Sequence, residues 1–309
     1  MNDSKTEVRQ PRILIFGSLG QLGVELRRWY ARSAVVTAVD LPDVDITNEA
    51  SLRAFIRVTN PEVVLNAAAY TAVDRAETEQ EIAHAVNAEA PRVMAEECRH
   101  LNALFVHYST DYVFDGTKPA PWVETDTPNP LSVYGASKLA GEQAVASVGG
   151  RYLIFRTSWV YGAHGKNFLL TMLRLGAERD QLSIVDDQIG APTTANLLAL
   201  NTRAIVAGIL DGDFGDASSW AGLYHMTCSG STSWFGFAEA IFSRASGFLG
   251  AKTPVLTPIS TSAYPTPAKR PLNSILSNEK LDARFGVSLR SWQSGLDDVF
   301  ADLMAKQER

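Results

Sequence analysis

Short apolar runs alternate with longer stretches of helical periodicity along the first half of the chain. Between the runs, residues 21–32, 82–99 and 137–147 space their apolar side chains as amphipathic helices do. Continuous apolar strands separated by helices are typical of a parallel sheet covered on both faces. The pattern therefore predicts an α/β fold with a doubly wound parallel sheet of Rossmann type, with strands at residues 13–16, 34–39, 63–65, 104–106 and 153–155.

The pattern changes after about residue 162, where prolines punctuate short segments and Trp220, Trp234 and Trp292 appear. We predict a smaller C-terminal substrate domain there. Because residues 195–210 have helical periodicity and could pack back on the sheet, the boundary is expected to be interleaved. The predicted division is a polar tail at 1–12, a dinucleotide-binding domain at 13–165 to which 195–224 returns, and a substrate domain at 166–194 and 225–309.

Composition excludes several classes of protein. The 309 residues, 46% of them hydrophobic, can bury a sizeable core, and a net charge of −6 without a long basic run argues against nucleic-acid binding. The polar start and the lack of an apolar run of ~20 residues argue against a membrane protein. Cys98, in a helix-like stretch, and Cys228, in a strand-like one, read as buried thiols, and their spacing indicates neither a metal cluster nor a disulfide. A cytoplasmic protein is expected.

A glycine-rich segment, GSLGQLG, follows the first predicted strand and opens a helix. Glycines in this context allow a tight turn and bring backbone N–H groups close to a pyrophosphate. The spacing GxxGxxG, from Gly17 to Gly23, favours the extended short-chain reductases over ordinary dinucleotide dehydrogenases. The alternative is a structural turn with a close helix–strand contact.

An acid at the end of the second strand bears on the choice of cofactor. Asp40 is placed to accept hydrogen bonds from an adenosine ribose and to repel a 2′-phosphate, which favours NADH, although it could simply end the strand. Asp45 and Ile46 are placed to meet the adenine, one through a hydrogen bond and the other through an apolar contact.

The segment YGASK puts Tyr134 and Lys138 four residues apart on one helical face. A neighbouring ammonium favours the phenolate, so we expect Lys138 to lower the pKa of Tyr134 toward the range of general acid–base catalysis. Thr110 ends the fourth strand, at the sheet edge where ligands bind in α/β folds. Its hydroxyl could orient Tyr134 and the substrate oxygen, or it could cap the turn before Asp111.

Seven segments resemble the extended short-chain dehydrogenase/reductases, and among them the dTDP-4-dehydrorhamnose reductase family, over nearly the whole chain after Arg12. They are FGSLGQLG, NAAAYTAVDRAE, HYSTDYVFDG, NPLSVYGASKLAGE, FRTSWVYG, DDQIGAPT and TSAYPTPAKRP. The resemblance implies reduction of a nucleotide-linked 4-keto sugar by NADPH, with NADH also plausible.

The resemblance also implies the site residues. The catalytic trio would be Thr110, Tyr134 and Lys138, and Asp111, Tyr112 and Trp159 would line the sugar pocket. Asn167 and Phe168 resemble a segment that closes over the substrate, and Arg270 would bind its pyrophosphate unless its loop is merely solvated. The cofactor would contact Lys138 and a set from the loops that follow the first three strands: Gly17, Gly20, Gln21, Leu22, Asp40, Asp45, Ile46, Ala67, Ala68, Ala69 and Tyr70.

Three positions separate the chain from other members or relatives of this group. Nucleotide-sugar 4,6-dehydratases carry a glutamate where this chain has Tyr112, so it lacks their base for elimination. Tyr70 stands where many family members have histidine. Asn196 stands where some have a glutamate that binds Mg²⁺ at a dimer interface, and an amide is the poorer ligand, so Mg²⁺ is doubtful and we expect a monomer or weak homodimer.

Two alternatives stay open. The same trio would support a reductase or epimerase of another nucleotide 4-keto sugar, because the fold does not set the sugar. A similar chain could also be the dinucleotide-binding regulatory subunit of a methionine adenosyltransferase, against which the intact trio argues.

Overall fold

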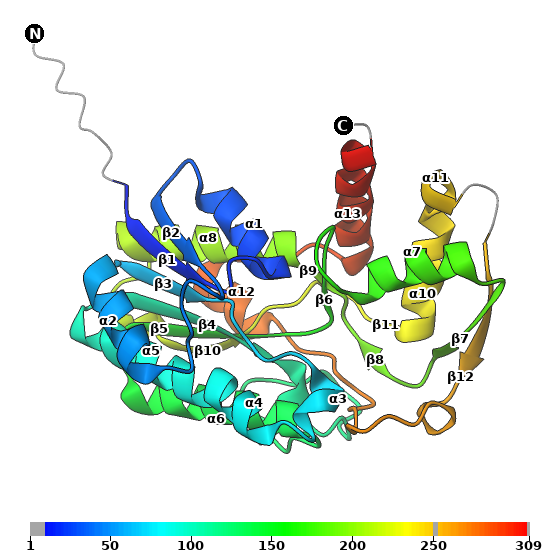
Figure 1. Cartoon of the computed structure of the whole chain (residues 1–309), viewed down its shortest axis with the longest axis horizontal. Coiled ribbons are helices and arrows are strands. Elements are labelled where there is room, and N and C mark those ends of the chain that lie inside the picture. The colour runs from blue at the N-terminus through cyan, green and yellow to red at the C-terminus, as the bar shows by residue number, and fades with distance from the viewer. Residues whose placement is uncertain (1–9, 250–252, 308–309) are drawn as a thin grey trace, which may run out of the picture.

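The computed structural model describes residues 10–249 and 253–307, and its centre is a parallel sheet of six strands (Figure 1). Their order is β10-β5-β4-β3-β1-β2, with β1 at Arg12–Phe16, β2 at Val35–Val39, β3 at Val63–Asn66, β4 at Leu104–Thr110, β5 at Tyr152–Thr157 and β10 at Gly222–His225. The doubly wound parallel sheet is thus confirmed, while β10 was not among the predicted strands. Residues 1–9 of the predicted polar tail lie outside the described residues.

Alternate strand residues enter two separate hydrophobic cores. Ile13 and Ile15 belong to one core, and Leu14 and Phe16 belong to the other. The first core lies under α1 (Gln21–Tyr30) and α8 (Ala195–Asp211), and the second lies under α2 (Glu49–Thr59) and α5 (Ala90–His100). Figure 1 shows these two pairs on opposite faces of the sheet. Nearly all residues of β1, β3, β4 and β5 are buried, which is why these strands read as continuous apolar runs, whereas the edge strand β2 is partly exposed.

The helix predicted at residues 82–99 is interrupted. The structure has α4 at Gln80–His84, a π-helical turn η1 at Ala85–Glu89 and then α5. A π turn inserts one extra residue into a helix and is frequent near functional sites. The helix predicted at 137–147 is longer, because α6 (Val133–Val148) begins at the Ser132 cap and therefore contains both Tyr134 and Lys138.

The first core continues beyond the sheet into the second half of the chain. Small strands pair there as β6 with β9, β7 with β12 and β8 with β11. They are β6 at Val160–Tyr161, β7 at Gln181–Val185, β8 at Ile189–Gly190, β9 at Thr193–Thr194, β11 at Thr232–Ser233 and β12 at Val255–Ile259. The helices are α7 at Phe168–Glu178, α9 at Ala217–Trp220, α10 at Trp234–Arg244, α11 at Ser246–Leu249, α12 at Glu279–Phe285 and α13 at Trp292–Gln307. Three short helical segments complete the described chain: α3 at Val73–Ala76 and the 3₁₀ turns η2 at Asp111–Val113 and η3 at Thr261–Ala263.

Both thiols are buried, as expected, but only one lies in the predicted kind of element. Cys98 is in α5, whereas Cys228 follows β10 in a loop, so the strand assignment of Cys228 was wrong. No helix among the described residues is long and apolar enough to cross a membrane.

Candidate active site

The loop between β1 and α1 can be built only with glycine at two positions. Gly17 has a φ of +74°, and a Cβ there would lie 2.5 Å from the backbone nitrogen of Ala68. A Cβ on Gly23 would lie 2.0 Å from the carbonyl oxygen of Gly17. The first glycine therefore lets the loop approach the end of β3, and the second lets α1 pack on the loop. A tight turn and close helix–strand packing of this kind are features of dinucleotide-binding loops.

A cavity of about 650 Å³ opens along this loop and the ends of β2 and β3. All the predicted cofactor residues of these loops line it except Gln21 and Leu22. Phe16, Leu19, Val39, Leu41, Val44, Thr47, Ile82 and Val86 also line it, although the sequence did not single them out. Polar groups at one end and apolar walls at the other suit a phosphate-linked aromatic ligand.

Gln21, Leu22 and Asn167 are placed differently from the expectation. Leu22 packs against the first core, and the Gln21 side chain accepts a hydrogen bond from Asn167 Nδ2 at 2.9 Å. Asn167 Oδ1 caps α7 by accepting from Leu170 N–H, and its Nδ2 also donates to the carbonyls of Gly162 and His164. In the ligand-free chain Asn167 therefore joins two loops, and its contact with substrate stays a prediction.

Asp40 stands beside the loop with both carboxylate oxygens engaged. One accepts the Leu19 N–H and the other accepts the Leu41 N–H, each at 2.9 Å. Asp45 is exposed and accepts hydrogen bonds from the backbone and hydroxyl of Thr47, which lower the pKa of its carboxyl. Both acids line the cofactor cavity.

Thr110 ends β4 and makes contacts on two sides. Its hydroxyl oxygen accepts the Tyr112 N–H at 3.2 Å, which caps η2, and its hydroxyl donates to Asp111 Oδ1 at 2.9 Å. The same hydroxyl hydrogen-bonds to Tyr134, which favours the phenolate. The turn-capping role and the contact with Tyr134 therefore coexist at one residue.

The acidity of Tyr134 is a correction to the sequence expectation. Burial raises the pKa of Tyr134 to about 12, and the hydrogen bond from Thr110 only partly opposes that effect. Lys138 does not act on the phenol as expected, because its Nζ donates to the Tyr108 carbonyl at 2.6 Å and lies 3.4 Å from His107 Nε2. Burial also lowers the pKa of Lys138 to about 8. In the ligand-free chain Tyr134 is thus a firmly protonated phenol.

The substrate side begins at Tyr112, whose ring meets that of Tyr134 edge-on with centroids 5.6 Å apart. Tyr112 hydrogen-bonds to Arg270, which also pairs with Asp74 at 2.9 Å. Arg270 lines a second cavity of about 690 Å³ between α7, β7 and the segment 259–270. One guanidinium therefore links the Tyr112 ring to this cavity.

Trp159 has a left-handed backbone, with φ of +49°, immediately after β5. Its ring stacks on Trp234 with centroids 3.5 Å apart, and a Cβ on Gly190 would lie 2.5 Å from it. The indole is thus held between a second ring and a glycine, and Trp234 also lines the 690 Å³ cavity. A bulky residue in this conformation is strained, which is frequent at ligand sites.

Comparisons with known proteins agree with this geometry. The model of the RmlD substrate binding domain family matches residues 11–305. A dTDP-4-dehydrorhamnose reductase from Burkholderia thailandensis is 47% identical over 96% of this chain and 100% of its own length. The chain belongs to the RmlD family of dTDP-4-dehydrorhamnose reductases.

Other relatives and solved structures extend the comparison with the RmlD family. The dTDP-4-dehydrorhamnose reductase of Escherichia coli K12 is 42% identical over 94% of this chain and 97% of its own. A crystal structure of the Bacillus anthracis reductase in complex with NADP has a TM-score of 0.88 and 36% identity, covering 95% of this chain and 100% of the other. A Thermus thermophilus UDP-glucose 4-epimerase, 22% identical with a TM-score of 0.73, shares the fold.

The two departures from the RmlD family pattern have defined contacts. Asn196 Oδ1 accepts the Trp29 indole N–H at 2.7 Å. The Tyr70 hydroxyl donates to Glu79, a hydrogen bond that raises the pKa of the phenol. Within residues 10–249 and 253–307, no group of three or more His, Cys, Asp or Glu is arranged to hold a metal ion.

Sequence reasoning missed Asn87, a buried residue of the π turn. Its Oδ1 accepts the Tyr70 N–H at 2.9 Å, and its Nδ2 donates to the Tyr70 carbonyl and to Ser137 Oγ, each at 3.0 Å. Asn87 thus ties the cofactor cavity to α6 beside the catalytic pair. The signal in the sequence was a polar residue on the apolar face of a predicted helix.

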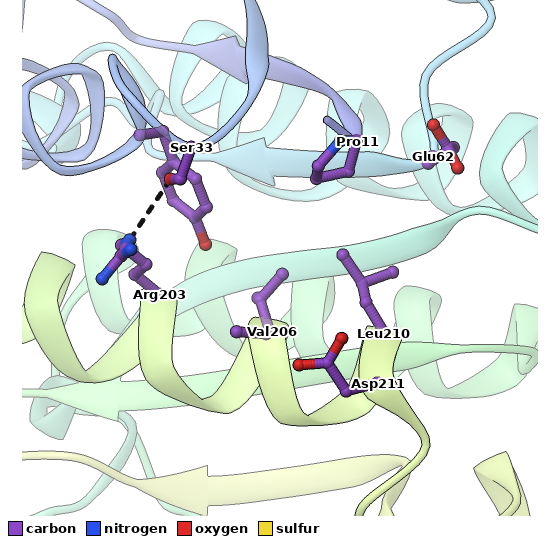
Figure 2. Close-up of a pocket in the computed structure, with 9 residues that line it drawn as sticks. Pro11, Ser33, Glu62, Arg203, Val206, Leu210 and Asp211 are labelled. Carbon is purple, nitrogen blue, oxygen red and sulfur yellow. Dashed lines mark hydrogen bonds between the residues drawn. The ribbon is translucent and has the colours of Figure 1, made fainter. Parts of the chain in front are cut away.

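A third cavity, of about 360 Å³, lies at the opposite, amino-terminal edge of the sheet. Figure 2 shows Arg203 and Ser33 at one end of it and Glu62 and Asp211 at the other. It shares no lining residue with the two cavities of the active site. None of the predicted site residues lines it.

Proposed function

We propose that the chain reduces dTDP-4-dehydro-β-L-rhamnose to dTDP-L-rhamnose with NAD(P)H, the last step of dTDP-rhamnose biosynthesis, and that Thr110, Tyr134 and Lys138 are its catalytic residues. The observation that carries the proposal is the buried, protonated Tyr134, hydrogen-bonded to Thr110 at the carboxyl end of β4. Membership in the RmlD family and the similarity to dTDP-4-dehydrorhamnose reductases at 47% and 42% identity support the choice of reaction.

The cofactor cavity fits a dinucleotide, because Gly17, whose lack of a side chain lets the loop approach β3, and the ends of β2 and β3 line one space of about 650 Å³. Gly20, Asp40, Asp45, Ile46, Ala67, Ala68, Ala69 and Tyr70 would complete the contact. Bound NADPH or NADH supplies the hydride. Because two backbone N–H groups already share the charge of Asp40, it repels a 2′-phosphate less than a free carboxylate would, and we propose NADPH as cofactor with NADH also accepted.

The residues of the chain supply the proton and the orientation. Tyr134 donates its proton to the ketone oxygen as a C–H bond forms at C4, so the carbonyl becomes an alcohol and the phenol becomes a phenolate. Thr110 orients the oxygen, and its hydroxyl turns from Asp111 to donate to Tyr134 as the phenolate forms. Lys138 must leave the Tyr108 carbonyl to hold the nicotinamide ribose and offset the new negative charge.

Substrate contacts follow from the other side of Tyr134. Asp111, Tyr112 and Trp159 would surround the sugar, and Arg270 would exchange its contact with Asp74 for the substrate pyrophosphate. Since Tyr112 carries no carboxylate, the site offers no base at that position for elimination.

The remaining assignments extend this proposal. Residues 13–165 and 195–224 would form the dinucleotide-binding domain, and 166–194 with 225–309 the substrate domain. Because Asn196 is engaged with Trp29 and brings no charge, we propose a cytoplasmic monomer or weak homodimer whose association does not depend on Mg²⁺.

The test is an assay of NADPH and NADH oxidation with dTDP-4-dehydrorhamnose generated in place, beside keto sugars of other nucleotides. We expect ketone-dependent oxidation that is fastest with the dTDP sugar. A preference for another nucleotide sugar would favour the alternative reductase or epimerase. Absence of turnover, together with co-purification of a methionine adenosyltransferase, would favour the regulatory subunit.

A further inference from the structure

A buried polar row ends at Lys138, and the mechanism above uses Lys138 but neither of the other two residues in the row. It consists of Asn66, the last residue of β3, His107 beside it on β4, and Lys138 on α6. Asn66 and His107 are fully buried, and Lys138 is 2% exposed. Asn66 Nδ2 lies 3.1 Å from His107 Nδ1, and His107 Nε2 lies 3.4 Å from Lys138 Nζ.

The orientation of the Asn66 amide is fixed from the other side. Its Oδ1 accepts the Ala68 N–H at 3.2 Å, which only an oxygen can do. Its NH₂ group therefore faces His107 Nδ1, so Nδ1 is the accepting nitrogen. A neutral imidazole has one accepting nitrogen and one N–H, which places the imidazole proton on Nε2.

The Nε2–H bond then points at Lys138. An N–H donor suits the lone pair of a free amine and repels an ammonium. The Tyr108 carbonyl accepts a hydrogen bond from Lys138 in either its neutral or its charged form. We propose that Asn66 and His107 are a positioning pair, which fixes the Nε2–H tautomer and disfavours the charged form of Lys138. The effect on catalysis rests on the proposed function of Lys138, whereas the tautomer does not.

The other groups around Lys138 are accounted for. Glu142, one turn further along α6, favours the ammonium, but it is paired with Arg156 of β5 through bonds of 2.9 and 2.6 Å. The π turn contributes the uncharged Asn87, and η2 contributes Asp111 beside Tyr134. Burial and Lys138 itself lower the pKa of His107 well below its usual range, so the imidazole stays neutral. Burial likewise lowers the pKa of Lys138.

The direct test is the ¹⁵N spectrum of the histidines in the whole, ligand-free chain, with His107 identified by its loss in His107→Gln. We expect the Nε2–H tautomer and no protonation of His107 from about pH 8 down to about pH 5, where an ordinary histidine of pKa ~6.5 would titrate. The Nδ1–H tautomer, or protonation in that range, would overturn the proposal. This measurement needs no turnover, so it stands even if the proposed reaction fails.

The second test reverses the tautomer. Asn66→Asp keeps the acceptor for Ala68 N–H but requires an N–H on Nδ1, so Nε2 becomes an acceptor for the Lys138 ammonium. The ammonium is lost as pH rises through the pKa of Lys138, and kcat should fall with it on the alkaline side. In Asn66→Asp this fall should occur about one pH unit higher than in wild type. At a pH where the wild-type kcat has already fallen, the kcat of the variant should therefore be about tenfold higher. NADPH affinity should change little.

A double-mutant cycle separates the tautomer from the added charge. In the His107→Gln background, Asn66→Asp adds the same charge, but there is no imidazole whose tautomer could change. We therefore expect the alkaline fall in kcat to shift by less than half as much as in the wild-type background. An equal shift in both backgrounds would contradict the positioning role. If Asn66→Asp does not fold, the ¹⁵N spectrum of the wild-type chain alone decides.

Discussion

Tyr134 shows how burial and a single hydroxyl set the chemistry of one residue. Removing the phenol from water raises its pKa to about 12, and the Thr110 hydroxyl offsets only part of that cost. A reductase needs this tyrosine as an acid, so the raised pKa keeps the proton in place until the substrate oxygen becomes basic. The expected role of Lys138 as an acidifier therefore belongs to the ligand-bound site, once its Nζ leaves the Tyr108 carbonyl.

Asp111 yields a prediction for stability. Burial raises its pKa to about 6 from 3.8, although hydroxyls of Ser274 and Thr110 oppose the shift. The protonated carboxyl of Asp111 therefore contributes fully to stability below a pH of 3.8, and this contribution is lost as pH rises through about 6. We expect Asp111→Asn to gain about 2–3 kcal/mol in free energy of unfolding relative to wild type between pH ~4 and pH ~8, measured by urea denaturation.

Asp115 supplies a control of opposite sign. Hydrogen bonds from Asn129 and Thr117 lower the pKa of its carboxyl, so its contribution is present at neutral pH and lost as pH falls. Asp115→Asn should therefore lose stability relative to wild type as pH rises from about 2 to about 5, and the difference should vary little above that range. A difference for Asp111→Asn that does not vary with pH would show that this carboxyl titrates normally.

The π turn η1 and helix α6 form the element that places the catalytic pair. Asn87 of η1 holds the Ser137 hydroxyl, and Gly141 brings α6 against the turn, since a Cβ on Gly141 would lie 2.1 Å from the Asn87 carbonyl oxygen. The close contact fixes the height of Tyr134 and Lys138 above the sheet.

Separating α6 from the π turn should therefore cost both stability and rate. We expect Gly141→Ala to lower the free energy of unfolding by about 1–3 kcal/mol through overpacking. Its kcat should fall by about tenfold or more, since a displacement of about 1 Å is costly in catalysis. In the control Gly162→Ala the new Cβ would meet only the Ala195 Cβ at 3.7 Å, and little should change. Equal effects in the two variants would contradict the account.

Apolar periodicity predicted most elements near the site because burial on both faces dictates it. Strands β1, β3, β4 and β5 follow this rule, whereas β10 was missed because Gly222 and His225 interrupt its apolar pattern. The π turn could not be predicted either, since its extra residue is set by packing against Gly141 and not by the composition of residues 85–89.

In the whole molecule, two separate cavities are available for the two proposed ligands. The 650 Å³ cavity belongs to the carboxyl ends of β1, β2 and β3, and the 690 Å³ cavity belongs to α7, β7 and the segment 259–270. Tyr112 and Arg270 connect the catalytic pair to the second cavity. A substitution at one cavity should therefore change the affinity for one ligand and leave the affinity for the other nearly unchanged.

Arg270→Met tests this separation. We expect the KM for the nucleotide sugar to rise by about tenfold or more, as for loss of a charge-assisted hydrogen bond, while NADPH affinity stays within about twofold. Lys269→Met is the matched control, because Lys269 is exposed beside Arg270, and its KM should be near that of wild type. A parallel loss of NADPH affinity in Arg270→Met would show that the two sides are not separate.

The site was predicted less evenly than the fold. Motif spacing identified the glycine loop and the Tyr134 region, because those residues meet their ligand through local geometry. The contact of Asn167 with Gln21 could not be predicted, because the two residues are 146 positions apart in the chain. Asn66 and His107 were missed because polar residues at the ends of apolar strands gain meaning only when neighbouring strands align.

The central claim is that Tyr134 protonates the substrate oxygen, and Tyr134→Phe tests it most directly. Single-turnover oxidation of NADPH by dTDP-4-dehydrorhamnose should slow by about 10²–10⁴-fold, with NADPH affinity and thermal stability close to wild type. A rate within a few-fold of wild type in a folded, NADPH-binding variant would contradict the claim.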